Sequence, residues 1–157
     1  MVEYINTLER YRKTVILSIA LAYPAKINTG VACAIASIIC LAIGFSISID
    51  ILMFLGLVLL IPAIYFLYFW TKIYRVRTVT MLRLYKKHSV ASLVYKFYYE
   101  DGVYHDVCKT IPQNAVEFRK KDIQKILYTK TNIYIKLFNE TVITLPNTKE
   151  IADMLKK

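Results

Sequence analysis

A stretch of 45 residues, from Ile27 to Thr71, contains a single charged side chain, that of Asp50. Asp50 divides the stretch into charge-free segments of 23 residues (27–49) and 21 residues (51–71). A helix of about 20 apolar residues is long enough to cross the roughly 30 Å hydrocarbon core of a bilayer. A single helix of 45 residues would be roughly 68 Å long, about twice that thickness. The stretch therefore predicts a transmembrane hairpin of two helices.

Asp50 is expected at the tip of this hairpin. A carboxylate at the centre of a bilayer costs roughly 2.5–3.5 kcal/mol, whereas a carboxylate at the turn between two spans is in contact with water. A role in an ion pathway is the alternative, but no second ionisable side chain lies within the stretch to act as its partner. We interpret Asp50 as a solvated turn residue.

Basic residues flank the hairpin only on the side away from Asp50. Four of them precede the first span, and six follow the second span within residues 72–87. Because Lys and Arg are enriched on the cytoplasmic side of membranes, both termini are predicted to be cytoplasmic. We expect six side chains of this segment to contact anionic lipid of the inner leaflet, and not nucleic acid: Lys72, Arg75, Arg77, Arg83, Lys86 and Lys87.

Small residues recur in both spans at intervals that place them on one helical face. Such residues allow close approach of two backbones in lipid, where the hydrophobic effect does not drive helix association. The predicted packing residues of the hairpin are Cys33, Ser37, Cys40, Gly44, Gly56 and Ala63.

Residues 1–26 are predicted to form an amphipathic N-terminal lead-in. The apolar run 14–23 is too short to span a bilayer, and Pro24 interrupts it. An interfacial helix is the first interpretation and a strand the second. A third alternative is a signal peptide, because Ala20-Leu21-Ala22 resembles a cleavage site.

Residues 72–157 are predicted to form a small α+β domain. Short segments with alternating apolar residues are separated by turn-forming residues, of which Glu100-Asp101-Gly102 is the clearest case. After Pro146, the pair Asn147 and Glu150 resembles a helix start. The pattern predicts a curved antiparallel sheet, or partial barrel, with one C-terminal helix packed on it.

Four segments resemble the YcxB-like family of small bacterial membrane proteins: YKFYYEDGV (95–103), EFRKKDIQKI (117–126), NIYIKL (132–137) and TLPNTKEI (144–151). The resemblance implies a two-span hairpin followed by a cytoplasmic domain of the pleckstrin-homology type, in the bacterial cytoplasmic membrane. It implies no catalytic residues, so none are assigned from it.

No enzyme motif is present. Gly102 is the only glycine after the hairpin, so neither a phosphate-binding loop nor a dinucleotide fingerprint can be formed there. His105 and Cys108 are three positions apart, which places them on opposite faces of a strand. No spacing of carboxylates specifies a metal or an acid–base pair. We therefore expect no catalytic residue, no metal and no cofactor.

The first functional hypothesis is a non-enzymatic inner-membrane protein whose cytoplasmic domain binds a protein partner, or a second copy of itself, at the membrane. Lys96, Tyr98 and Tyr99, on a hairpin predicted at the sheet edge, are its candidate contacts. One alternative is an immunity protein that protects its host from a membrane-active toxin or bacteriocin. The other is a module that senses anionic lipid.

Overall fold

The computed structural model describes residues 1–111 and 115–156. The chain forms two compact units. The first, here called the sheet domain, combines residues 1–22 with the segment from residue 77 to the C-terminus. The second, here called the hairpin, consists of residues 23–76. In the order of the chain, the hairpin is therefore an insertion within the sheet domain.

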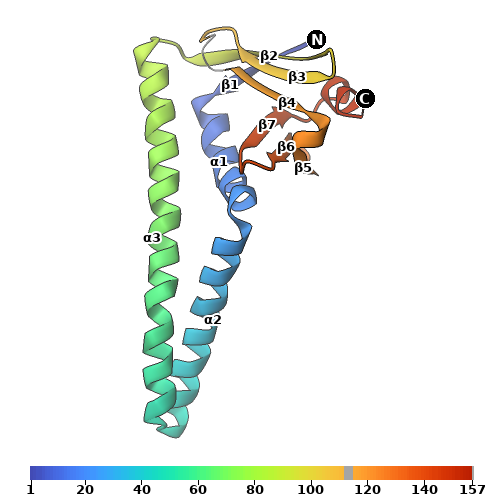
Figure 1. Ribbon diagram of the computed structural model, residues 1–157. Helices are drawn as coiled ribbons and strands as arrows, with labels where there is room; N and C mark the ends of the chain where they lie inside the picture. The colour runs from blue at the N-terminus through green and yellow to red at the C-terminus, as the bar shows by residue number, and fades with distance from the viewer. Residues whose placement is uncertain (112–114, 157) are drawn as a thin grey trace. The chain divides into compact units, whose positions relative to one another are not determined.

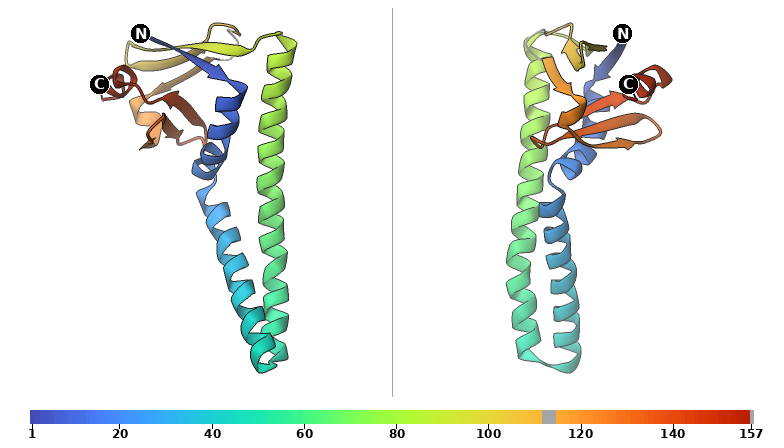
Figure 2. Two further views of the ribbon diagram at one scale, coloured as in Figure 1. Left: turned by 180° about the vertical axis from the view of Figure 1, so that it is seen from behind. Right: turned by 45° about the vertical axis from the view of Figure 1, so that its right-hand side comes forward.

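The hairpin consists of α2 (Pro24–Ile47) and the first part of α3 (Asp50–Lys87), joined by a two-residue turn (Figure 2). Both helices are long and apolar enough to cross a membrane. Ser48 adopts the left-handed conformation (φ 52°), and the Ile49 N–H donates to the Gly44 carbonyl at 3.0 Å, which ends α2. Asp50 is exposed in the first turn of α3, at the tip where the sequence predicts it.

α3 continues well past residue 71, where the sequence predicts the second span to end. Residues 72–87 contain neither glycine nor proline, and several of them are strong helix formers, so nothing interrupts the helix at the end of the apolar segment. The basic segment is thus the C-terminal part of one 38-residue helix.

Three glycines lie where α2 and α3 approach closely. A Cβ atom on Gly44 would lie 2.7 Å from Met53 Cγ and 2.9 Å from the Met53 backbone nitrogen. A Cβ on Gly56 would lie 2.7 Å from Leu41 Cγ, and one on Gly30 2.6 Å from Phe66 Cβ. The hydroxyl of Ser37, which is fully buried, donates to the Gly56 carbonyl at 2.7 Å.

Replacement of Gly44 by leucine is expected to destabilise the hairpin by about 2–3 kcal/mol, because the contact with the Met53 backbone leaves no side chain that could move away. Unfolding of the full chain in mixed micelles, followed by the fluorescence of Trp70, measures this. Ala42→Leu adds a similar side chain at an exposed position of α2 and should have little effect. Equal stabilities of the two variants would contradict the prediction.

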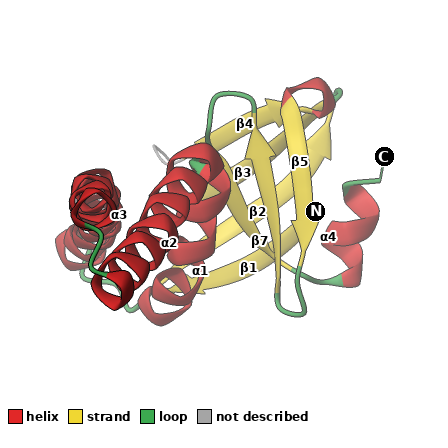
Figure 3. Cartoon of the chain, turned by 90° about the horizontal axis from the view of Figure 1, so that it is seen from below, coloured by secondary structure: helices red, strands yellow, loops and turns green. Residues whose placement is uncertain are grey.

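The sheet domain contains two antiparallel sheets (Figures 1 and 3). The first has the order β1 (Val2–Thr7), β2 (Ser92–Glu100), β3 (Val103–Cys108) and β4 (Ala115–Arg119). The second has the order β5 (Ile123–Tyr128), β6 (Asn132–Leu137) and β7 (Val142–Pro146), and a short 3₁₀ turn, η1 (Lys120–Asp122), precedes β5. The antiparallel sheet and the terminal helix, α4 (Lys149–Met154), agree with the prediction.

Residues 1–22 do not form a separate lead-in. β1 pairs with β2 from Val2 opposite Phe97 to Thr7 opposite Ser92. α1 (Leu8–Ala22) follows and packs against β6 and β7. The apolar residues of α1 that indicated an interfacial helix are its buried face, with Val15 and Ile19 almost fully covered. The sheet domain therefore consists of two separate chain segments. The boundaries between the domain and the hairpin lie at residues 22 and 77, and not at the predicted residues 26 and 72.

The main core lies between the two sheets and α4. It contains Phe97, Tyr104 and Phe118 of the first sheet, and Ile135 and Leu145 of the second. Ile151 and Leu155 close it from α4 and the residue that follows.

Two turns fix local geometry in the sheet domain. The turn between β2 and β3 has positive φ at Asp101 (50°) and Gly102 (80°), as in the two-residue hairpin turns that suit the twist of a sheet. At the start of α4, the Ile151 N–H donates to Thr148 Oγ1 at 3.4 Å. Thr148 is thus the N-cap, and the predicted cap Asn147 instead donates its side-chain N–H to the Thr129 carbonyl at 2.6 Å.

Candidate functional site

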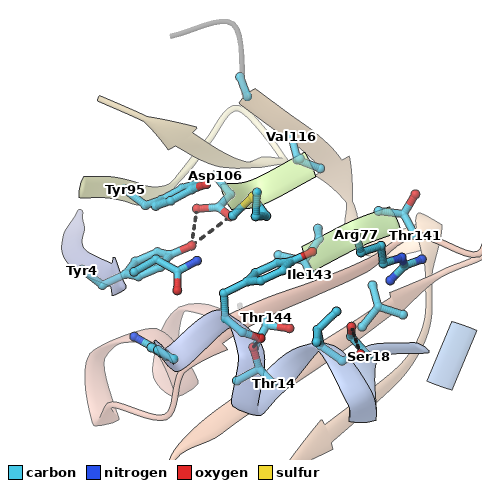
Figure 4. Close-up of a pocket in the computed structure, with 17 residues that line it drawn as sticks. Tyr4, Thr14, Ser18, Arg77, Tyr95, Asp106, Val116, Thr141, Ile143 and Thr144 are labelled. Carbon is cyan, nitrogen blue, oxygen red and sulfur yellow. Dashed lines mark hydrogen bonds between the residues drawn. The ribbon is translucent and has the colours of Figure 1, made fainter. Parts of the chain in front are cut away.

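A cavity of about 310 Å³ lies inside the sheet domain (Figure 4). Its walls come from β1 and α1, from the C-terminal part of α3, and from β2, β3, β4 and the segment 141–144 at β7. Tyr4 comes from the segment before the hairpin and Arg77 from the segment after it. Both residues line this cavity. A molecule bound there would contact both of them.

A buried carboxylate is the most unusual group in the cavity wall. Asp106 is only 6% exposed, and its two oxygens accept from the Tyr4 hydroxyl at 2.9 and 3.0 Å (Figure 4). Tyr4 lies on β1 and Asp106 on β3, so this bond crosses the intervening strand β2. The ring of Tyr4 stacks on that of Tyr95 of β2, with 5.3 Å between the centroids.

Burial changes the acidity of this pair. It raises the pKa of Asp106 from 3.8 to about 6, and the hydrogen bond from Tyr4 only partly opposes this shift. The pKa of Tyr4 is raised as well, first by burial and then by the nearby Asp106 carboxylate. Asp106 is therefore mainly ionised at pH 7, and it titrates closer to neutral pH than an ordinary carboxyl group does.

Two arginines also line the cavity. Arg10 is held in place, because its guanidinium donates to the Ile5 carbonyl at 3.1 Å and to Asn132 Oδ1 at 2.9 Å. Arg77 is half-buried and makes no hydrogen bond or ion pair with any residue that the structure describes. The cavity thus combines one buried acid with one half-buried guanidinium, which interacts electrostatically with Tyr11.

The other chemically active side chains do not form a catalytic group. His105 contacts Glu117 at 3.1 Å, while Cys108 is buried with Tyr85 and Leu93. The two lie on opposite faces of β3, as their spacing predicts. Among residues 1–111 and 115–156, no group of three or more His, Cys, Asp or Glu side chains is placed to hold a metal ion.

The predicted partner contacts do not lie on an edge strand. Lys96, Tyr98 and Tyr99 are in β2, which lies between β1 and β3. Lys96 pairs on both sides, whereas Tyr98 and Tyr99 pair with β3 but extend past the last residue that pairs with β1, Phe97. The Lys96 ammonium lies 5.1 Å from the centre of the Tyr98 ring, and Tyr98 stacks on His105 at 4.7 Å. The prediction of an edge was wrong for Lys96, because the N-terminal strand pairs there, opposite Glu3; Tyr98 and Tyr99 lie beyond this pairing.

The six predicted membrane-surface residues are divided between the two units. Lys72 and Arg75 belong to the hairpin, whereas the other four follow in the part of α3 that belongs to the sheet domain. Five of the six are exposed: Lys72, Arg75, Arg83, Lys86 and Lys87. Arg77 differs, because it lines the cavity.

The predicted packing residues of the hairpin are also divided. Ser37, Gly44 and Gly56 lie at the contact of α2 and α3, as described above. Cys33 and Cys40 are half-buried free thiols, and Ala63 lines a groove between the helices.

Tyr4 and Asp106 were not identified from the sequence. The alternation in β3 places Asp106 on the same face as Tyr104 and Cys108, which was a detectable sign of a buried acid. Its partner, however, is 102 residues away in the chain.

Comparison of the chain with models of protein families, with curated proteins and with solved structures gave no match.

Proposed function

We propose that this chain is a non-enzymatic, two-span protein of the bacterial cytoplasmic membrane, whose sheet domain binds a protein partner or a second copy of itself at the membrane. One observation carries the proposal: the hairpin is inserted within the sheet domain, between α1 and β2. Because β1 is paired within the same sheet as β2, both ends of the hairpin lead into one folded domain.

If both helices cross the membrane, this connectivity returns the chain to the side on which it entered, so residues 1–22 and the segment from residue 77 onward would lie on one side. The distribution of charge supports a cytoplasmic domain. Lys26, Lys72 and Arg75 flank the ends of the hairpin that lead into the domain, and Asp50 is the only charge at the tip.

A pleckstrin-homology-like fold and the YcxB-like resemblance are part of the proposal. A four-stranded and a three-stranded antiparallel sheet followed by a C-terminal helix support a partial barrel of that type. In this chain, β1 would be the first strand of the barrel, and the hairpin would interrupt the barrel after it.

Cysteine labelling in intact cells tests the orientation. In a background without Cys33, Cys40 and Cys108, an impermeant thiol reagent should label Asp50→Cys and not Asp153→Cys, an exposed position in α4. Permeabilised cells, in which both positions should be labelled, provide the control. Labelling of position 153 alone in intact cells would invert the orientation.

Site-specific crosslinking from membranes tests the interaction. A photo-reactive residue at Tyr99, which is exposed at the end of β2, should capture a defined protein or a second copy. The same residue at Asp50 should not give this product. Failure to recover a partner or a dimer from Tyr99, and from exposed Tyr128 on β5, would contradict the proposal.

Exposed apolar residues of the second span favour immunity as a second candidate. Leu57, Ile61 and Ile64 are all more than half exposed and would be available to the spans of a toxin. Deletion of the gene should then increase sensitivity to a membrane-active toxin. Lipid sensing, supported by the exposed bases of α3, predicts that binding to anionic vesicles weakens steeply as salt rises.

A further inference from the structure

A second cavity lies entirely within the hairpin. It is a groove of about 490 Å³ between α2 and α3, and all the residues that line it are apolar. On α2 it extends from Ile27 through Gly30 to Ala34, and on α3 its walls include Ala63, Leu67 and Trp70. The groove therefore occupies the half of the hairpin that is farther from Asp50 in the chain.

Small side chains create this space. The two helices touch at Gly30 and Phe66 and again at Ser37 and Gly56. Ala34, which lies between these contacts along α2, leaves a gap where a larger side chain would fill the interface. The groove follows about two turns of α2, a length of roughly 12 Å.

A cation, Lys26, lies next to one end of the groove without lining it. Ile27 and Trp70 line this end of the groove. The residues just before them in the chain, Lys26 and Phe69, belong to an aromatic–cation cluster that also includes Tyr23. The Lys26 ammonium in that cluster lies 4.6 Å from the centre of the Phe69 ring and 5.3 Å from that of Tyr23. Lys72 and Arg75 are the other cations of the hairpin, whose only acid, Asp50, is at the opposite end. No carboxylate of the hairpin therefore neutralises Lys26.

We propose that this groove binds one anionic glycerophospholipid, with an acyl chain between the helices and the phosphate near Lys26. The inference rests on the proposed membrane insertion of the hairpin. An apolar wall that ends at an uncompensated ammonium matches an acyl chain that ends at a phosphate.

Native mass spectrometry of the full chain, released from a mild detergent, tests the site. The protein is incubated with an equimolar mixture of phosphatidylglycerol and phosphatidylcholine that have the same acyl chains. One bound phosphatidylglycerol is expected, at about five times the occupancy of phosphatidylcholine, because a basic residue near an anionic headgroup contributes about 1 kcal/mol.

Two variants separate the headgroup from the groove. Lys26→Gln should reduce the preference for phosphatidylglycerol about fivefold and leave acyl binding in place. The double variant Ala34→Leu/Ala63→Leu fills the groove and should remove both lipid adducts. Ala42→Leu is the matched control, since Ala42 is exposed on α2 outside the groove, and it should bind lipid as the wild type does. Unchanged circular dichroism and gel filtration establish that each variant is folded.

Three outcomes would overturn the inference. Equal occupancy by the two lipids in the wild type would exclude the role of Lys26. Full retention of phosphatidylglycerol by the double leucine variant would exclude the groove. A lipid-free dimer that the leucines disrupt would identify a second copy as the occupant. Capture of a partner from Tyr99 in the double leucine variant would show that the proposed function stands without this lipid.

Discussion

Residues 77–157 expressed alone should fail to form a stable fold, and joining residues 1–22 to them should restore it. Without residues 1–22, β2 loses the strand that pairs with it over six residues, and the core loses Tyr4, Val15 and Ile19. Burial of each such side chain contributes about 1.5–3 kcal/mol. The combined loss is comparable to the whole stability of an ordinary domain, about 5–15 kcal/mol.

The restored chain would replace the hairpin by a flexible Gly/Ser linker of about 12 residues between Ala22 and Arg77, which spans roughly 20 Å on average. It should give dispersed amide resonances and a cooperative thermal transition, whereas the fragment 77–157 should give neither. Ile19→Asp in the linked chain should abolish the transition, because Ile19 is 1% exposed. Ile16→Asp is the matched control, at a position of α1 that is 50% exposed. A cooperative transition of the fragment alone would contradict this division of the chain.

The features predicted correctly depend on local composition. The helical hairpin follows from two apolar segments separated by Asp50, each about as long as one helix of 20 residues or slightly more. The turn at Asp101 and Gly102 follows from residue types that tolerate positive φ. In both cases the decisive residues are neighbours in the chain.

The features that were missed depend on pairing across the hairpin. The apolar run 14–23 has the same pattern whether its helix lies on a membrane or packs against a sheet. The location of this helix is set by β1, which precedes it and pairs with a strand about 90 residues away in the chain. For the same reason, Lys96 seemed to lie on an edge strand, and Asp106 had no visible partner. The missing information was one antiparallel register, from Val2 opposite Phe97 onward.

Asp106→Asn should stabilise the sheet domain at neutral pH by up to about 3 kcal/mol. The pKa of this carboxyl is about 6 in the folded protein and 3.8 ordinarily. Between these pH values the folded state retains a proton that the unfolded chain releases, so stability falls as the pH rises from about 4 to 6. Two pKa units correspond to about 3 kcal/mol. Asparagine does not ionise, and its carbonyl oxygen still accepts from the Tyr4 hydroxyl.

Thermal unfolding of the full chain in micelles, followed by near-ultraviolet circular dichroism, measures the effect. The Tm of Asp106→Asn should exceed that of the wild type by roughly 10 °C at pH 7.5 and should match it near pH 4. Asp153→Asn removes an exposed acid and should leave the pH dependence unchanged. A variant less stable than the wild type at pH 7.5 would show that the ionised carboxylate stabilises the fold. The expected result would instead mean that Asp106 is retained at a cost in stability, which is typical of residues that serve a site and not the fold.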